Sequence, residues 1–401
     1  MPRPLTCEIS IAAMRHNLDR VRQYFSEVRK APIGVWSVVK ANAYGHGLDN
    51  AIRAFASSDG LALIEVDYAA KLRNYGWQKP ILMLEGPFDL TDVEVARRLD
   101  FSLVIHRAEQ FYWLKQTAKS ACSTSLGLDI WLKFNTGMNR LGFTEADVAM
   151  VRSELSNLSA LGVRSIGLAT HFANSDVAPN QGSGAMVTVD EQHERFRAIW
   201  LSLKQSVPHL RVSLSNSSAV MGYQHLYDDL YESEAGFPWL RPGVMLYGGT
   251  PYADLTLQSP KQLGLMPAMA LRAKILSVQS IAGGDAIGYG SRYVAKQAMR
   301  VGIVAVGYAD GYPRQAPDGT PVWVGGTRTK LVGRVSMDMI VIDITGLNSV
   351  GVDSEVELWG GNLPIDEVAQ ACGTIGYELM CAVAPRVARV SIDELLSCDG
   401  V

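Results

Sequence analysis

Short apolar runs alternate with amphipathic segments through the first 250 or so residues of this 401-residue chain. Apolar runs of this length that end in small or polar residues are typical of buried strands. When such strands alternate with helices, they form βαβ units and a parallel sheet. The predicted strands are Gly34–Lys40, Leu61–Glu65, Pro80–Glu85, Phe101–His106, Gly127–Phe134, Val163–His171 and Arg211–Asn216.

The segments between these runs have helical periodicity. They include Leu48–Ala56, Val66–Tyr75, Thr91–Leu99, Glu109–Lys119, Glu145–Ser156 and Val189–Gln205. Seven strands and a short eighth one ending near Arg241 favour a (β/α)8 TIM barrel. A doubly wound open sheet is the alternative, but such a sheet usually has a glycine-rich phosphate turn after its first strand, and we find none here.

The pattern changes near Leu265, where strands that alternate between polar and apolar residues begin. Turn signals such as Gly325-Gly326 separate them. We therefore expect a barrel over residues 1–260 and a separate, mainly antiparallel β domain over 261–401, with Ile365–Ala371 as its one good helix candidate. The predicted strands of this domain are Ala268–Ile281, Val301–Gly307, Val322–Val324, Lys330–Val335, Met339–Ile344 and Glu355–Leu358.

Composition excludes several classes of function. Thirty-seven basic and 40 acidic side chains give a net charge of −3, and no long run of like charge predicts a nucleic-acid partner. No apolar stretch approaches the ~18 residues of a membrane span. The five cysteines are widely spaced, which disfavours a disulfide framework and a metal site. The N-terminus lacks an apolar signal core, so we expect a cytoplasmic protein.

Lys40 ends the first predicted strand. The carboxyl ends of barrel strands carry the active residues of barrel enzymes, and a lysine there can form a Schiff base. A lone lysine at a strand end more often marks where the strand reaches water. The following Tyr44-Gly45-His46-Gly47 favours the functional interpretation, because small residues beside a phenol suit close approach of a ligand.

Barrels often bind phosphate at the ends of their last two strands. Ser217 follows the seventh strand, and Arg241-Pro242-Gly243-Val244 follows the eighth. Pro242 suits the first position of a short helix, whose N–H groups at Gly243 and Val244 would face an anion. Each segment alone is a common loop, but together they predict an anion site.

Three other residues are weaker candidates on their own. His171 ends the sixth strand, where a buried structural histidine is the commoner interpretation. Arg140 follows the fifth strand and could bind a carboxylate or could simply be a solvated loop residue. Tyr289 lies between two glycines, as at a hairpin tip.

Taken together, these segments resemble alanine racemase, a fold-type III pyridoxal-phosphate enzyme. They occur in the family's order and span nearly the whole chain, and the ordered set is highly specific. The matching segments are residues 39–47, 136–142, 171–173, 216–217, 241–248, 288–290, 307–312 and 336–339, together with Tyr377.

The resemblance implies pyridoxal 5′-phosphate as cofactor. Lys40 would bind it covalently, and Arg241 would face the pyridine nitrogen. Since an arginine does not give up its proton at ordinary pH, that nitrogen would stay unprotonated, which favours return of the proton to Cα. His171 would join a hydrogen-bond chain from Arg241. The residues implied to hold the phosphate are Tyr44, Ser217, Gly243, Val244 and Tyr377.

The resemblance also implies interconversion of L- and D-alanine by two bases, one on each face of Cα. Lys40 would serve the D-enantiomer, and Tyr289 of a second subunit would serve the L-enantiomer. A homodimer with shared sites follows. Arg140 and the backbone of Met337 would hold the substrate carboxylate. The implied surroundings of the site and its entrance are Lys133, Asp176, Tyr308, Arg314, Arg334, Asp338 and Ile375.

Some positions depart from the family pattern. Lys133 matches a lysine that many members carry as a carbamate, but Asn135 replaces the usual aspartate, so a bound anion such as chloride could instead lie beside Arg140. Ser213 replaces a histidine found in some members. The segment Ser175–Thr188, which contains Pro179–Gly184, has the composition of a surface loop.

Other functions with the same cofactor are a broad-specificity amino-acid racemase, a fold-type III decarboxylase and a non-catalytic pyridoxal-phosphate carrier. The β domain and its tyrosines argue against the carrier, which is a barrel alone. The missing signal core argues against the broad-specificity racemase, whose exported members usually carry one. The sequence does not separate supply of D-alanine for peptidoglycan from a role in alanine catabolism.

Overall fold

The computed structural model describes residues 3–28, 32–120, 125–177, 186–207, 209–228, 230, 238–252 and 258–396. Cys122, Cys398 and the predicted loop Pro179–Gly184 lie outside them. The chain packs into two units. One contains Leu18–Ala43 and Phe55–Gly243, and the other contains Met1–Asn17, Tyr44–Ala54 and Val244–Val401.

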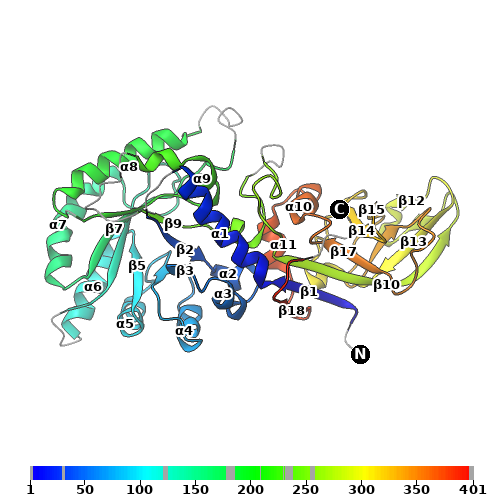
Figure 1. Ribbon diagram of the computed structural model, residues 1–401, viewed down its shortest axis with the longest axis horizontal. Helices are drawn as coiled ribbons and strands as arrows, with labels where there is room; N and C mark the ends of the chain where they lie inside the picture. Colours follow the sequence, from blue (N-terminus) through cyan, green and yellow to red (C-terminus); the bar gives the residue numbers. More distant parts are fainter. Residues whose placement is uncertain are drawn as a thin grey trace. The chain divides into compact units, whose positions relative to one another are not determined.

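The first of these units is an eight-stranded parallel barrel (Figure 1). Its strands pair in the order β8-β7-β6-β5-β4-β3-β2-β9, and β8 and β9 are joined by two further hydrogen bonds. The backbone N–H of Arg241 donates to the Ser215 carbonyl (3.0 Å), and Ser213 Oγ donates to the Trp239 carbonyl (2.7 Å). The predicted TIM barrel is confirmed. The strands are β2 (Gly34–Val38), β3 (Gly60–Leu63), β4 (Ile81–Met83), β5 (Phe101–Ile105), β6 (Asp129–Lys133), β7 (Ser165–Ala169), β8 (Arg211–Ser213) and β9 (Trp239–Leu240).

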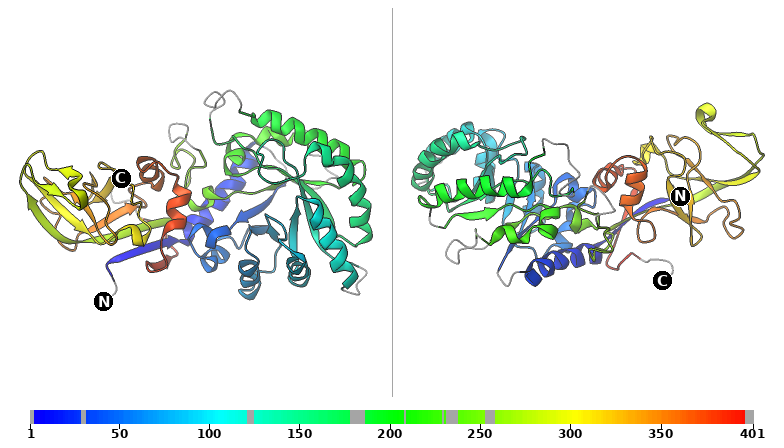
Figure 2. Two further views of the ribbon diagram at one scale, coloured as in Figure 1. Left: turned by 180° about the vertical axis from the view of Figure 1, so that it is seen from behind. Right: turned by 90° about the horizontal axis from the view of Figure 1, so that it is seen from above.

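Helices follow most of the barrel strands, and α4 to α8 cover the outer face of the barrel (Figures 1 and 2). Helix α1, the longest helix among the described residues, was not among the predicted elements. The helices are α1 (Ile11–Val28), α2 (Lys40–Tyr44), α3 (Leu48–Ala54), α4 (Val66–Asn74), α5 (Leu90–Leu99), α6 (Ala108–Ser120), α7 (Val148–Ala160), α8 (Val189–Lys204) and α9 (Ser217–Gly222), with short 3-10 turns at η1 (Glu145–Asp147), η2 (Gln224–Tyr227) and η3 (Val244–Tyr247).

Local sequence explains these elements. Every residue of β2, β3, β4 and β5 is buried, as expected for parallel strands covered on both faces, which read as continuous apolar runs. Helix α8 begins with a capping box. Thr188 Oγ1 accepts from the Glu191 N–H (3.1 Å), and Glu191 Oε2 accepts from the Thr188 N–H (2.7 Å), which satisfies two donors that the helix leaves unpaired.

Three tryptophans pack together inside the barrel. The rings of Trp36 and Trp239 stack with centroids 4.4 Å apart, and Trp131 meets both edge-on at 6.4 and 6.3 Å. Glycines on neighbouring strands leave room for them, since a Cβ at Gly34, Gly60 or Gly167 would lie closer than 3.0 Å to one of these rings.

We predict that Gly60→Ala destabilises the barrel. The added methyl would overlap the Trp36 ring, which is held by contacts with Trp239 and Trp131, so the free energy of unfolding should fall by about 1–3 kcal/mol. Chemical denaturation followed by tryptophan fluorescence measures this. Gly351→Ala is the control, because nothing lies within 4 Å of its added Cβ. Equal stability of the two variants would contradict the prediction.

The second unit is built on a mainly antiparallel sheet. Its path is β15-β14-β17-β10-β1-β18, and β13 pairs with β10 and β16. The first strand of the chain, β1, pairs antiparallel with β10 and parallel with β18. The strands of the unit are β1 (Leu5–Ser10), β10 (Met269–Ile281), β11 (Ala286–Ile287), β12 (Tyr293–Val294), β13 (Met299–Val304), β14 (Pro321–Val324), β15 (Thr327–Lys330), β16 (Ile340–Asp343), β17 (Glu355–Trp359) and β18 (Ala388–Ile392).

The predicted β domain is confirmed as a fold, with corrections to its elements. The hairpin β14–β15 turns at Gly325 and Gly326, whose φ angles of 57° and 73° are those of a tight two-residue loop. The strand predicted over Lys330–Val335 instead ends at Lys330. A second helix, α11 (Gly376–Ala382), follows α10 (Ile365–Ala371). Helix α11 begins with a glycine and has only seven residues, so it shows too little helical periodicity to be predicted.

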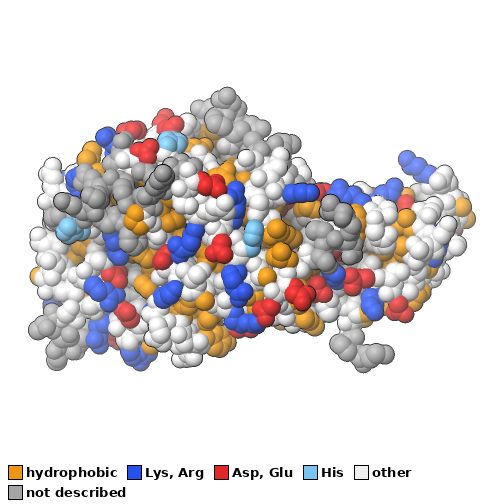
Figure 3. Space-filling model, in the orientation of Figure 1, with side chains coloured by type: hydrophobic (Ala, Val, Ile, Leu, Met, Phe, Trp, Pro, Cys, Tyr) orange, Lys and Arg blue, Asp and Glu red, His pale blue; other side chains and the backbone are white. Residues whose placement is uncertain are grey.

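Charged side chains of both signs are interspersed on the face shown in Figure 3, in keeping with the nearly balanced charge. Within the described ranges, no helix has the length and apolar character needed to cross a membrane. The same part of the chain contains no group of three metal-binding side chains placed to hold an ion.

Candidate active site

The predicted site residues of the barrel lie at the carboxyl ends of its strands, where barrel enzymes place their chemistry. Lys40 follows β2, Lys133 ends β6 and His171 follows β7. Ser217 begins α9 after β8, and Arg241 follows β9 directly. Parallel strands in one barrel bring these ends to the same rim.

The chain turns in the left-handed sense after Lys40. Ala41, Asn42, Ala43 and Tyr44 all have φ between 52° and 55°. This conformation costs non-glycine residues about 1–2 kcal/mol each, so neighbouring contacts must hold it. The Ala41 N–H donates to Glu65 Oε1 (3.0 Å), and the Ala43 N–H donates to the Val39 carbonyl (2.8 Å). This turn fixes the backbone on which Lys40 begins.

Arg241 is buried, with 8% of its surface exposed. Its guanidinium donates to the carbonyls of Thr170 (2.5 Å) and Leu214 (3.0 Å) and to Ser213 Oγ. Among the described residues it forms no ion pair with a carboxylate, and burial lowers its pKa to about 10. Arg241 is therefore a fixed, charged donor whose charge no carboxylate among the described residues balances.

A buried tyrosine holds the loop that receives Arg241. Tyr227 Oη donates to Ser215 Oγ (2.9 Å) and accepts from the N–H groups of Leu214 (3.4 Å) and Ser215 (3.1 Å). These bonds fix the Leu214 carbonyl that binds the guanidinium. Sequence reasoning missed Tyr227, because nothing in the local pattern links it to the end of β8.

Positive charges gather at this rim. Burial, and then Arg241, Arg140 and Lys40, lower the pKa of Lys133 to about 8, against an opposing effect of Glu85. Burial and the same cations, with Lys133, hold the pKa of His171 well below its ordinary value, so this imidazole is neutral at pH 7. Such an excess of cations over carboxylates suits the binding of anions.

The loop between Lys133 and Arg140 is folded by its own side chains. Asn135 Oδ1 accepts from the N–H groups of Gly137 (3.1 Å) and Asn139 (2.9 Å). Its Nδ2 donates to Asn139 Oδ1 (3.0 Å). Asn135 thus acts as a loop-folding residue, and Arg140 itself is exposed.

We predict that Lys133 reacts with acetic anhydride as a lysine of low pKa. Only the neutral amine reacts, so its labelling rate should level off near pH 8, and near ~10.4 in the denatured protein, which is the control. Mass spectrometry of the Lys133 peptide after short pulses at pH 6–11 measures both. An inflection at the same pH in both states would contradict the prediction. Between about pH 8 and ~10.4, Lys133 is protonated in the unfolded state and largely neutral in the folded state. Lys133 therefore makes the free energy of unfolding rise with pH over this range.

The predicted phosphate segments are linked by a hydrogen bond. The Gly243 N–H donates to Ser217 Oγ (2.8 Å), so this N–H is already used, and the serine hydroxyl keeps its own proton for another acceptor. Asn216 Oδ1 accepts from the Ala219 N–H (3.1 Å) and caps α9. The nearby Asp176 is half-buried, which raises its pKa.

In the other unit, Tyr44 is buried against aromatic rings. It stacks on Tyr247 with centroids 4.8 Å apart and lies 6.1 Å from Tyr377, a residue of α11. Burial raises the pKa of Tyr44 well above its ordinary value, so the phenol keeps its proton as a donor. Gly45 allows this packing, because a Cβ there would collide with the Met380 carbonyl of α11.

Tyr289 lies on a tight turn and is 72% exposed. Gly288 and Gly290 on either side have φ angles of 74° and 70°, and the turn lies against Arg334. Tyrosine is enriched at contact surfaces between proteins, and at this exposure the Tyr289 side chain is accessible to a partner.

Two further turns of this unit carry exposed predicted residues. Tyr308 begins the 3-10 turn η5 (Tyr308–Asp310), and the Arg314 guanidinium lies 6.0 Å from its ring. Met337 is 53% exposed and Ile375 is 52% exposed. The Tyr308 N–H donates to the Ser336 carbonyl (3.1 Å), which joins the turn of Tyr308 to that of Met337.

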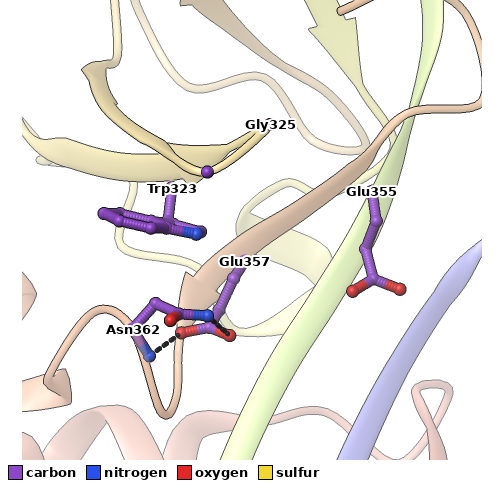
Figure 4. A pocket seen from close by; sticks show the side chains of 6 residues that line it. Trp323, Gly325, Glu355, Glu357 and Asn362 are labelled. Atoms are coloured by element: carbon purple, nitrogen blue, oxygen red, sulfur yellow. Dashed lines mark hydrogen bonds between the residues drawn. The ribbon is translucent and has the colours of Figure 1, made fainter. Parts of the chain in front are cut away.

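The second unit also has a pocket that is not lined by the predicted site residues (Figure 4). Its volume is about 220 Å³, and Trp323 and the carboxylates of Glu355 and Glu357 line it. Both carboxylates are paired with Arg272, and Glu357 also accepts from the backbone of Asn362. These interactions hold the ends of strands together, and none of them involves a predicted site residue.

Comparison with known proteins identifies the family. The family model for the alanine racemase N-terminal domain matches residues 9–251, and that for the alanine racemase C-terminal domain matches residues 268–391. The chain belongs to the alanine racemase family. An alanine racemase from Janthinobacterium sp. (strain Marseille) is 47% identical over 393 residues, which cover 98% of this chain and 100% of the relative.

Solved structures of alanine racemases have the same fold. The biosynthetic enzyme from Pseudomonas aeruginosa is 40% identical with a TM-score of 0.83 and covers 97% of this chain and 99% of its own. The enzyme from Acinetobacter baumannii is 36% identical with a TM-score of 0.84, covering 97% and 100%. A Bartonella henselae alanine racemase with covalently bound pyridoxal phosphate is 22% identical with a TM-score of 0.80, covering 98% and 100%.

Alanine racemases are isomerases that interconvert L- and D-alanine, so the predicted family, fold and enzyme class are confirmed. The roles of individual residues stay predictions. The structure adds the residues that support them, namely Glu65, Tyr227 and the cluster of Thr136, Thr170 and Gln192. In that cluster the two threonine hydroxyls lie 2.8 Å apart, and Gln192 Nε2 donates to Thr136 Oγ1 (3.1 Å).

Proposed function

We propose that this chain interconverts L-alanine and D-alanine with pyridoxal 5′-phosphate as cofactor, at a site completed by a second copy of the chain. The observation that carries the proposal is the buried, charged Arg241 among Lys40, Lys133 and Arg140 at the barrel rim. This charge suits a phosphorylated cofactor and a substrate carboxylate. Membership of the alanine racemase family supports the choice of both.

The residues present fit the cofactor. Lys40 provides an amine for its aldehyde, and Arg241 provides a fixed donor for its pyridine nitrogen. The phosphate would be held by Tyr44, Ser217, Val244 and Tyr377, and by the Gly243 N–H in place of its present bond to Ser217 Oγ.

When joined to the substrate amine, the cofactor draws electron density away from Cα and makes its proton removable. Lys40 Nζ then exchanges the proton on the face of D-alanine, and Tyr289 Oη of the partner chain exchanges it on the face of L-alanine. Arg140 and the backbone of Met337 orient the carboxylate. Neutral His171, which is buried among these cations, would join a hydrogen-bond chain from Arg241 to the partner's base.

Substrate size is set by aromatic side chains. Tyr289 and Tyr377 narrow the inner end of the entrance, which favours the methyl group of alanine, with serine as a slow substrate. The outer entrance is lined by Asp176, Tyr308, Arg314, Arg334 and Ile375. We place this activity in the cytoplasm, where it supplies D-alanine for peptidoglycan or takes part in alanine catabolism.

Proton exchange tests the activity. We expect the Cα proton signal of L-alanine to disappear in proton NMR when the purified protein is incubated with it in D2O. Lys40→Ala should abolish this exchange, because it removes one base and the covalent cofactor link. Lys261→Ala, at an exposed lysine, is the matched control.

The same measurement decides between the racemase alternatives. Serine, lysine and arginine are run beside alanine. Faster exchange of lysine or arginine than of alanine would favour a broad-specificity racemase. If protein that contains pyridoxal phosphate exchanges the Cα proton of none of these amino acids, the racemase proposal is wrong.

Mixed dimers test the shared site. Lys40→Ala and Tyr289→Phe chains are each expected to be inactive alone. Random assembly of equal amounts should recover about a quarter of wild-type activity, because half of the dimers are mixed and each mixed dimer holds one intact site. Steady-state racemisation assays measure this recovery. Inactivity of the mixture, with mixed dimers shown to form, would mean that Lys40 and Tyr289 act within one chain.

A further inference from the structure

Two turns of the second unit carry predicted substrate-facing residues, and Arg386 hydrogen-bonds to a carboxylate of each. Arg386 Nε donates to Asp310 Oδ1 (2.8 Å), and its Nη2 donates to Asp338 Oδ1 (2.6 Å). Asp310 ends the turn that begins with Tyr308, and Asp338 directly follows Met337. A single guanidinium therefore holds two carboxylates from two separate turns.

Asp310 also organises its own turn. It is fully buried, and its Oδ2 accepts from the Gly307 N–H (2.9 Å). The Asp310 carbonyl accepts from the Ala384 N–H (3.0 Å), and Gly311 lies so close to the Ala382 carbonyl that a Cβ would not fit. The turn is thus seated on the chain segment that carries Arg386.

The two turns are in direct backbone contact. The Ala309 N–H donates to the Met337 carbonyl (3.0 Å), and Gly307 packs so closely on the same carbonyl that no side chain would fit there. A shift of either turn therefore moves Met337. Arg3 contacts the same two turns. Its guanidinium donates to the Asp338 carbonyl and lies 3.5 Å from Asp310 Oδ2 and 3.9 Å from Asp338 Oδ1.

We propose that Arg386 is a positioning residue for racemisation, which acts through Asp338 and Asp310 to fix Met337 and Tyr308 for the carboxylate of a substrate bound in the partner chain's barrel. This inference rests on the proposed function. The planar fork of arginine reaches both carboxylates at once, whereas the single ammonium of lysine does not. Arg386→Lys keeps the charge and loses the bridge, so it isolates this geometry.

The experiment uses mixed dimers with two affinity tags, isolated by tandem purification. One chain carries Lys40→Ala and the other carries Tyr289→Phe, so the one intact site uses Tyr289, Met337 and Arg386 of the Lys40→Ala chain. Arg386→Lys in that chain should raise KM for alanine roughly 10-fold and change kcat less, because displacement of a binding group by a fraction of an ångström costs this much. The same substitution in the other chain should leave KM unchanged.

Several outcomes overturn the inference. An equal rise in KM from both placements would show a general effect on folding, and no rise from either would show that the bridge is unimportant. Arg53→Lys, at the exposed pair with Asp393, is the matched surface control. If Arg386→Lys chains do not fold, Asp338→Asn breaks the same bridge at its other end with the same expected split. Inactive mixed dimers without any change at Arg386 would instead contradict the proposed shared site.

Discussion

The buried guanidinium of Arg241 is the interaction on which the barrel site depends. Burying a charge without an opposite charge costs several kcal/mol, and here carbonyl and hydroxyl groups from the ends of β7 and β8 offset part of that cost. The same residue closes the barrel, because its N–H joins the end of β9 to the Ser215 carbonyl. Barrel closure and the charge of the site thus meet at one residue. A side-chain substitution at Arg241 would remove the charge and the guanidinium's hydrogen bonds but keep the closure bond, because every residue except proline has the backbone N–H.

The cations around Arg241 influence one another through burial. Burial first, and then the positive groups around them, lower the pKa values of Lys133 and His171. A bound anion would reverse this effect by favouring the charged forms. Binding of a phosphate or carboxylate is consequently coupled to the protonation of the rim, which links substrate affinity to pH even where neither base takes part.

The sequence predicts the barrel because its buried strands are short apolar runs, and it predicts the site because strand-end residues such as Lys40 and Arg241 lie where the fold gathers them. Contacts between residues far apart in the chain could not be predicted from the sequence. Strand β1 pairs with β10 and β18 more than 250 residues away, so it has no local signature. Arg386 likewise joins Asp310 and Asp338 through distances in sequence that no periodicity reveals. Tyr227 and Glu65 support the site by side-chain hydrogen bonds to the backbone, which composition does not encode.

The left-handed turn after Lys40 has a consequence for chirality. Ala41, Asn42, Ala43 and Tyr44 adopt backbone angles that are natural to D-amino acids and strained for L-amino acids. A chain assembled with D-alanine at positions 41 and 43 would relieve that strain without changing the path of the backbone. This short turn would therefore be less strained if it were built from D-alanine, which alanine racemases produce, than it is with the L-amino acids that the ribosome supplies.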